Sequence, residues 1–254
     1  MKLTHKLCGA TLVALAGVAL AAPNTTKAVE DTGSGAGTIK FTIGTDTKDV
    51  LPTEPGVSDG TKITNIPDVK NPGEFGIIAV TPLDFDSHDS LTASKKRDYN
   101  ALPFAANAGS VDADAPEFQV QNFVKYQDLR AVATHNYKLS AELTENFKTA
   151  TGIELNGANI NYTSVYTTQT GDAVLDPDGV KNAGGTISVG SPVEFINNSG
   201  VNGKGYGQFE LNFGKVGDAV QPAESAVTLN IPTSTAIGTG DYQATITWTL
   251  SDVI

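Results

Sequence analysis

The sequence predicts an all-β fold, either an antiparallel β-sandwich or a barrel-like domain with long loops. Short segments in which apolar and polar residues alternate recur along the chain, and such alternation indicates strands with one buried face. Glycine, proline and asparagine separate these segments, as turns between strands require. No long segment of the sequence shows the spacing of an amphipathic helix. The alternation favours antiparallel pairing, with one face of each sheet open to water.

The clearest of these segments spans residues 242–250, near the end of the sequence. Its apolar positions, each two residues from the next, are Tyr242, Ala244, Ile246, Trp248 and Leu250. The positions between them are Gln243, Thr245, Thr247 and Thr249. This alternation predicts a half-buried strand, because a helix would scatter the same residues around its axis.

The other expected strands are distributed over the whole chain. They are residues 37–43, 75–80 with 83–85, 117–126, 137–143, 153–162, 186–196, 207–213 and 226–231. Residues 47–73 differ from them, because four prolines stand among Asp, Glu, Thr and Gly with few apolar residues. Such a composition buries too little surface to order firmly, so we expect a long loop within the domain. A basic cluster at residues 95–97 predicts a solvated turn or short helix.

The first 28 residues have the features of a secretory signal peptide. A basic start precedes an apolar run, residues 12–22, which is too short to span a bilayer. Small residues offer two cleavage sites, after Ala28, which we prefer, or after Ala21. We therefore expect a secreted protein whose single domain comprises residues 29–254.

Cysteine content and the end of the sequence limit how this domain is held together and retained. Cys8 precedes the apolar run and is lost with the signal peptide, so a packed core must stabilise the domain without disulfides. A second hydrophobic segment, a sortase-type LPxTG signal and a basic tail are all missing from the sequence. We therefore expect no membrane anchor and no covalent anchor of its own.

The charge of the domain excludes several kinds of partner. Removal of residues 1–28 takes away three lysines and no acidic residue, which changes the formal net charge from −11 to −14. Such an acidic chain does not bind nucleic acid or anionic lipid by counterion release. Teichoic acids are also polyanions, so retention at a wall would require stacking, hydrogen bonds or a bridging cation.

Residues 242–250 resemble the distal motif of the WxL domain, a cell-surface module of low-GC Gram-positive bacteria. The motif is a tyrosine, three further residues, an aliphatic residue and Thr-Trp-x-Leu, matched here by Tyr242, Ile246, Thr247, Trp248 and Leu250. The proximal motif of the family includes Trp-x-Leu-Ser, and residues 136–143 are similar to it, with Tyr137 in place of the tryptophan. Further similarities before and after this motif extend the resemblance over essentially the whole mature chain.

The resemblance implies noncovalent attachment to the peptidoglycan of the cell wall, at the cell surface. It also implies partnership with other WxL proteins and with a membrane-anchored WxL-interacting protein. The candidate binding residues belong to the two motifs and are Tyr242, Thr247, Trp248, Leu250, Tyr137 and Leu139. In an alternative hypothesis, the chain is an interaction subunit that the wall retains only through its membrane-anchored partner.

Trp248, the only tryptophan of the chain, allows two interpretations. As a binding residue, its flat indole would stack on the sugars or peptide stems of peptidoglycan and donate one N–H. As a structural residue, it would point into the core with the other apolar residues of the strand, which the alternation favours. The binding surface would then lie elsewhere, for example on the opposite face, where the three threonines present a row of hydroxyls. The same choice applies to Tyr137 and Leu139.

Residues that could bind a metal ion occur without a recognised spacing. Aspartates close in sequence are Asp84, Asp86 and Asp89, with the pairs Asp112/Asp114 and Asp176/Asp178. Calcium needs six to eight oxygen ligands, so these groups are more typical of solvated acidic turns than of a calcium site. His88 and His135 are far from each other and from any motif with metal-ligand spacing. We expect no metal and no cofactor.

Catalytic motifs are also weak. Asp31-Thr32-Gly33 matches one loop of an aspartic protease, but that chemistry needs two such loops and the sequence contains one. Paired carboxylates for glycan hydrolysis can assemble in three dimensions without a sequence motif, so a cell-wall glycan hydrolase is the alternative from the enzyme class. We expect a binding protein without catalysis.

Overall fold

The computed structural model describes residues 39, 51–67, 71–89 and 96–253. The chain divides into two compact units, residues 1–42 and 43–254, and the fold described below is that of the second unit. The predicted signal peptide and the strand expected at residues 37–43 lie outside the described residues, apart from Ile39, which is exposed.

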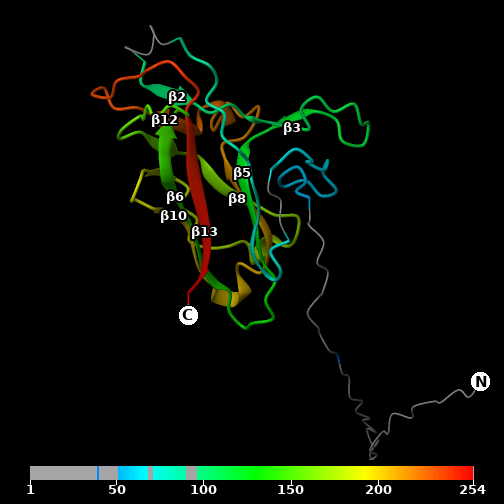
Figure 1. Ribbon diagram of the computed structural model, residues 1–254. Helices are drawn as coiled ribbons and strands as arrows, with labels where there is room; N and C mark the ends of the chain where they lie inside the picture. The colour runs from blue at the N-terminus through cyan, green and yellow to red at the C-terminus, as the bar shows by residue number, and fades with distance from the viewer. Residues whose placement is uncertain (1–38, 40–50, 68–70, 90–95, 254) are drawn as a thin grey trace, which may run out of the picture. The chain divides into compact units, whose positions relative to one another are not determined.

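Three sheets and one hairpin make up the described part, and all pairings between their strands are antiparallel (Figure 1). Sheet I contains, in spatial order, β1 (Phe75–Val80), β5 (Asn122–Asp128), β11 (Gly207–Phe213) and β8 (Val165–Thr168). Sheet II contains β10 (Val193–Ser199), β6 (Asn136–Lys148) and β13 (Gln243–Asp252). Sheet III contains β2 (Asp98–Asn100), β12 (Val227–Asn230), β7 (Asn159–Tyr162) and β9 (Gly185–Ile187). The hairpin consists of β3 (Phe104–Ala106) and β4 (Phe118–Val120).

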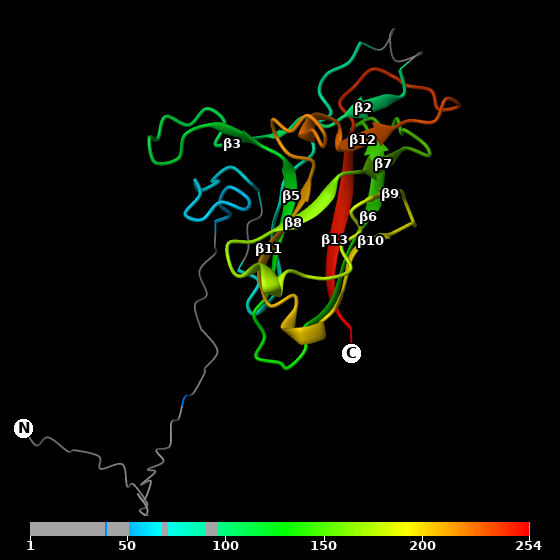
Figure 2. The same cartoon turned by 180° about the vertical axis from the view of Figure 1, so that it is seen from behind.

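Helical structure in the described residues is limited to three short 3-10 helices. They are η1 (Ala173–Leu175), η2 (Val201–Gly203) and η3 (Ala223–Ser225). Seen from behind in Figure 2, β5, β8 and β11 lie on one side of the molecule, and β6, β10 and β13 lie on the other. The predicted all-β antiparallel sandwich is therefore confirmed, and none of the described sheets closes into a barrel.

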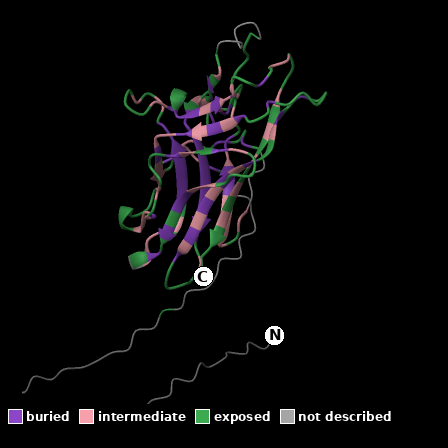
Figure 3. Cartoon of the chain, turned by 90° about the vertical axis from the view of Figure 1, so that its left-hand side faces the viewer, coloured by how far each residue is buried: buried purple, intermediate pink, exposed green. Residues whose placement is uncertain are grey.

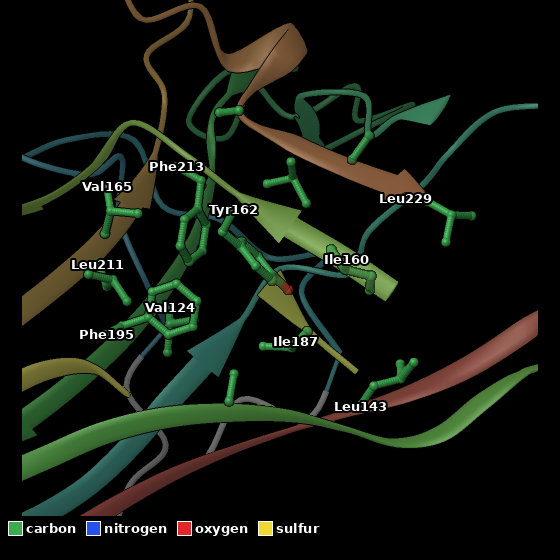
Figure 4. Close-up of a cluster of buried hydrophobic side chains, with 14 of the residues drawn as sticks. Val124, Leu143, Ile160, Tyr162, Val165, Ile187, Phe195, Leu211, Phe213 and Leu229 are labelled. Atoms are coloured by element: carbon green, nitrogen blue, oxygen red, sulfur yellow. The ribbon is translucent and has the colours of Figure 1, made fainter. Parts of the chain in front are cut away.

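One hydrophobic core joins the three sheets and explains the alternation in the sequence. Figure 4 shows side chains from β5, β6, β7, β10, β11 and β12 gathered in a single cluster. The Tyr162 ring lies at its centre, 5.3 Å from the ring of Phe195 and 4.6 Å from that of Phe213, measured between centroids. Along β7 and the first part of β6, buried residues alternate with less buried ones, as a period of two requires, and the buried residues of the strands are purple in Figure 3.

β5 differs from the other strands because all seven of its residues are buried. Val124 and Tyr126 belong to the main core, whereas Phe123 belongs to a second, smaller cluster on the other face of sheet I. On that same outer face, Lys125 forms a buried ion pair with Glu210 of β11, with Nζ and Oε1 2.8 Å apart. Sheet I is therefore covered on both sides.

Residues 51–66 form part of this outer covering, together with the β3–β4 hairpin. Ile63 and Ile66, 0% and 5% exposed, belong to the second cluster. The Asn107 side chain accepts a hydrogen bond from the Thr64 N–H and donates one to the Lys62 carbonyl, each at 2.8 Å. The expectation that residues 47–73 order only weakly is wrong for this part of the loop, since an apolar sheet face and a buried asparagine hold it.

Candidate functional site

The last strand, β13, lies at the edge of sheet II and carries Thr247, Trp248 and Leu250. The candidates Tyr137 and Leu139 lie on its neighbour, β6. β13 pairs with β6 over nearly its full length, from Gln243 opposite Lys148 to Asp252 opposite Tyr137 (red beside green in Figure 1). Its other edge pairs with none of the described strands. Residues along β13 alternate between half-buried and exposed, so the strand has an inner and an outer face, as the sequence predicts.

Trp248 lies on the inner face and is half-buried. Its indole packs against three core rings, with centroid distances of 5.2 Å to Phe195, 5.8 Å to Phe213 and 5.9 Å to Tyr162. Such aromatic contacts stabilise a core beyond the area that they bury. Leu250 is half-buried on the same face. Of the two interpretations of Trp248, this geometry supports the structural one.

Tyr242 supports the start of the strand. Its hydroxyl accepts a hydrogen bond from the Gly238 N–H at 3.1 Å and donates one to the Gly238 carbonyl at 3.0 Å. The ring is half-buried and packs against the main core. Tyr242 therefore fixes the turn that leads into β13.

Tyr137 and Leu139, the candidates from the proximal motif, are both 0% exposed. The Tyr137 hydroxyl lies 3.4 Å from the Tyr126 hydroxyl, and burial raises the pKa of Tyr137 well above its usual value. With no surface open to solvent, these two side chains offer nothing to a ligand in this structure. They hold β6 against the core, directly beside β13.

The outer face of sheet II presents a different chemistry, which we call the hydroxyl face. It comprises the exposed Thr144, Thr245, Thr247, Thr249 and Ser251, with the partly buried Ser140. The Thr144 and Thr247 hydroxyls are 2.8 Å apart, and the Thr245 hydroxyl donates to Glu145 at 2.9 Å. Thr247 is thus the one motif candidate whose side chain lies on this exposed surface.

A groove with a volume of about 1230 Å³ runs between β1 of sheet I and β13 of sheet II; we call it the β1–β13 groove. One wall is formed by residues 77–88 and the other by residues 237–248, except Thr245. Core side chains such as Phe213 and Tyr162 form its floor, and Trp248 also lines it. Sequence reasoning missed this groove, because its walls are about 150 residues apart in the chain and neither carries a motif for it.

A partly buried charge cluster joins the start of β1 to the end of β13, beyond the residues that line the groove. Arg130 lies with its guanidinium 4.1 Å from the ring centroid of Phe75, the first residue of β1, and pairs with Asp252, the last residue of β13, at 2.8 Å. It also donates two hydrogen bonds to Asp128, from Nε at 2.9 Å and from Nη2 at 2.8 Å. Burial alone would raise the pKa of Asp128, but the hydrogen bonds from Arg130 and His135 outweigh it and lower this pKa.

Several of the acidic residues named from the sequence accept hydrogen bonds within the protein, either inside a turn or from the end of β10. Asp84 accepts from the Asp86 N–H at 2.8 Å, and Asp112 accepts from the Asp114 N–H at 2.9 Å. Asp178 accepts from the Ser199 hydroxyl at 2.5 Å. Within the described residues, no three His, Cys, Asp or Glu side chains gather as metal ligands would.

The two candidate histidines lie in different surroundings. Nε2 of His88 is 2.6 Å from the Phe85 carbonyl, and its ring lies 4.3 Å from that of Tyr99. Nδ1 of His135 is 3.0 Å from the Asp128 carboxylate.

Among the described helices, none is long and apolar enough to cross a membrane.

Comparison with known proteins agrees with this arrangement. The sequence profile of the family described as "WxL domain surface cell wall-binding" matches residues 27–253, which is nearly the whole chain. No curated protein and no solved structure matches the chain significantly. This description names a domain that binds the cell wall at the cell surface. The chain therefore belongs to the WxL family, and the protein is a cell-wall-binding protein of the cell surface.

Proposed function

We propose that the protein attaches noncovalently to peptidoglycan through the hydroxyl face of sheet II and performs no catalysis there. The observation that carries this proposal is the exposed row of Thr245, Thr247 and Thr249 on the strand that bears the family motif. The side chains on the inner face of the same strand are half-buried against the core, whereas those on the outer face are exposed, which makes the outer face the more accessible surface of the motif strand.

Hydroxyl groups suit a glycan with peptide stems, because each donates one hydrogen bond and accepts others. Along one face of a strand, side chains repeat about every 6.8 Å, so three threonines offer regularly spaced contacts to an extended polymer. The charged side chains on this face already have partners. Lys138 pairs with Glu194 at 2.8 Å, and Glu142 accepts from the Gly190 N–H at 3.0 Å. Neutral hydrogen bonding therefore supports the interaction better than ion pairing does.

The other motif residues have supporting roles in this proposal. Trp248, Leu250 and Tyr242 hold β13 on the core, and Tyr137 and Leu139 hold β6 beside it. The proposal includes assembly with other WxL proteins and a membrane-anchored WxL-interacting protein, as the family resemblance implies. If the wall retained the protein only through such a partner, the purified protein alone would not bind peptidoglycan.

The test is sedimentation of the purified protein with insoluble peptidoglycan from which teichoic acids and proteins have been removed. A variant with Thr245, Thr247 and Thr249 all changed to Val keeps the β-branched shape and removes the three hydroxyls. We expect the wild-type protein to pellet and this variant to lose at least about tenfold in affinity, since each lost hydrogen bond is worth about 1 kcal/mol.

Two controls make the result specific. A variant with serine at the same three positions keeps the hydroxyls and should pellet like the wild type. Thr186→Val removes an exposed threonine from β9 in sheet III and should have no effect. Equal pelleting of the triple valine variant would contradict the role of the hydroxyl face, and release of soluble muropeptides would contradict the absence of catalysis.

A further inference from the structure

The β1–β13 groove is a gap along one side of the sandwich, at which the core lies open. β1 is an edge strand of sheet I, and β13 is an edge strand of sheet II. The inner residues of β13 beside the groove are only half-buried, and they include Ala244, Ile246 and Trp248. A strand laid along β13 would cover them.

The two edges that border the groove differ as templates for an added strand. β1 has a bulge between Ile77 and Ala79, and bulges interrupt the regular spacing of backbone groups that a partner strand needs. β13 has register shifts with β6 between Gln243 and Ile246, and it keeps regular register from Ile246 to Asp252, of which Ile246, Thr247 and Trp248 line the groove. From Ile246 onward, the edge of β13 therefore offers backbone N–H and C=O groups in regular order beside a groove whose floor is apolar.

One end of the groove is acidic, and the other end lies toward Arg130. Arg130 links the start of β1 to the end of β13, and the groove does not extend to those residues. At the opposite end, the lining includes the exposed carboxylates of Asp84, Asp86 and Asp241. No lysine or arginine is among its described lining residues. An occupant of complementary charge would carry a basic residue at this end.

We propose that the groove binds an extended segment of a partner protein, which pairs as an additional strand with the edge of β13 that none of the described strands occupies. The segment has apolar residues at alternate positions, which contact the floor, and at least one lysine or arginine near Asp86 and Asp241. Addition of a strand to an open sheet edge supplies main-chain hydrogen bonds for affinity and side-chain pockets for specificity. This interaction uses the face of β13 opposite the hydroxyl face, so it goes beyond attachment to the wall.

The test uses the full chain without its predicted signal peptide and a synthetic ten-residue peptide. In this peptide, isoleucine alternates with threonine, and a lysine lies near each end. Trp248 lines the groove and is the only tryptophan, so its fluorescence reports occupancy directly. We expect a saturable change of Trp248 emission on titration with the peptide, and unchanged sedimentation of the protein with peptidoglycan when the peptide is bound.

Two controls separate strand pairing from simple apolar contact. A peptide N-methylated at every second residue keeps its side chains but cannot donate to the β13 edge, and we expect its affinity to fall by about tenfold or more. In the protein, Asp86→Asn with Asp241→Asn should weaken binding of the lysine peptide by about threefold to tenfold. Asp114→Asn, which removes an exposed carboxylate outside the groove, should leave binding unchanged.

Three results would overturn the proposal. The first is the lack of any saturable change in Trp248 emission with the peptide. The second is equal affinity of the N-methylated peptide, which would show that the edge of β13 is not used. The third is competition for the groove by soluble peptidoglycan fragments or by self-association of the protein, because either would assign the groove to a different occupant.

Discussion

Trp248 is the residue on which the interpretation of the motif depends. Its indole contacts Phe195, Phe213 and Tyr162, which come from β10, β11 and β7 and thus from all three sheets. A tryptophan at this position joins the last strand to the rest of the core. Alternation along residues 242–250 favoured its inward direction and the outward direction of the threonines, but it left the ligand role of the indole open.

Replacement of Trp248 tests this structural role. We expect Trp248→Ala to lower the free energy of unfolding by about 3 kcal/mol, the low end for loss of a large core ring, because the indole is only half-buried. Trp248→Phe keeps a ring in the same space and should cost less than about 1.5 kcal/mol. Urea unfolding followed by circular dichroism measures both. An alanine variant as stable as the wild type but unable to bind the wall would contradict the structural role.

Asp128 makes stability depend on pH in an acidic range. Its pKa in the folded protein is lower than the usual value of 3.8, so the unfolded chain binds this proton more readily. The stabilisation is therefore fully present above about pH 4 and is lost as the pH falls through the lowered pKa. We expect Asp128→Asn to lower stability by about 3 kcal/mol at pH 7, as loss of a buried ion-pair partner does.

The melting temperature measures this prediction. Between about pH 4 and pH 2, it should fall more steeply for the wild-type protein than for Asp128→Asn. Parallel curves for the two proteins would show that the Arg130–Asp128 pair contributes no pH-dependent stability.

At the scale of secondary structure, long alternating segments were predicted best. The segment expected at residues 207–213 coincides with β11, and that expected at 242–250 becomes β13, Gln243–Asp252. The strand expected at 153–162 is shortened to β7, Asn159–Tyr162, because residues before it form a turn in which the Thr149 N–H bonds to the Ile153 carbonyl at 2.8 Å. β2, β3 and β8 were missed, since three or four residues are too few to show a period.

Turns between strands also set limits on substitution, and two glycines differ in a way that can be measured. Gly184 and Gly190 both have positive φ, +75° and +73°, so alanine is strained at either position. A Cβ at Gly184 would lie 1.9 Å from the Tyr162 carbonyl oxygen in β7, whereas a Cβ at Gly190 would meet nothing within 4 Å. At Gly184, but not at Gly190, the nearby backbone of Tyr162 therefore adds a steric clash to the strain of an alanine substitution.

We therefore expect Gly190→Ala to lower the free energy of unfolding by about 1 kcal/mol, which is the strain of an alanine at positive φ without any steric clash. Gly184→Ala should cost at least about 2 kcal/mol more, because β7 and β9 must separate to admit the methyl group. Denaturant midpoints of the two variants provide the comparison. Equal midpoints would mean that the turn before β9 moves freely, contrary to the packing seen here.

At the scale of the whole molecule, the sequence predicts the fold class and the family but not the groove. The all-β sandwich follows from repeated alternation, and the family follows from two short motifs. The groove depends on which two edges of different sheets face each other, and residues 77–88 and 237–248 contain no local sign of that. The layer formed by residues 51–66 was likewise hidden, because its apolar residues are few and only Ile63 and Ile66 join the second cluster.

Net charge acts on the whole molecule and leads to a prediction about salt. Without the predicted signal peptide, the chain carries −14 by formal count, so we expect it to repel teichoic acid. This repulsion weakens as salt shortens the Debye length from about 30 Å at 0.01 M to about 10 Å at 0.1 M. We expect more protein to pellet with native walls at the higher salt concentration. Walls stripped of teichoic acid should show no such rise. A fall with salt on native walls would mean that attractive ion pairs dominate.

The central claim is that the outer face of β13 contacts the wall while Trp248, on its inner face, remains in the core. Its most direct test is the fluorescence emission of Trp248 during titration with soluble peptidoglycan fragments. Sedimentation first establishes the fragment concentration that releases the protein from insoluble peptidoglycan. At that concentration, we predict that Trp248 emission and its quenching by acrylamide stay unchanged, because the wall contacts the threonine face and the indole remains in the core. A blue shift with protection from the quencher would place the wall ligand on Trp248 and contradict this account.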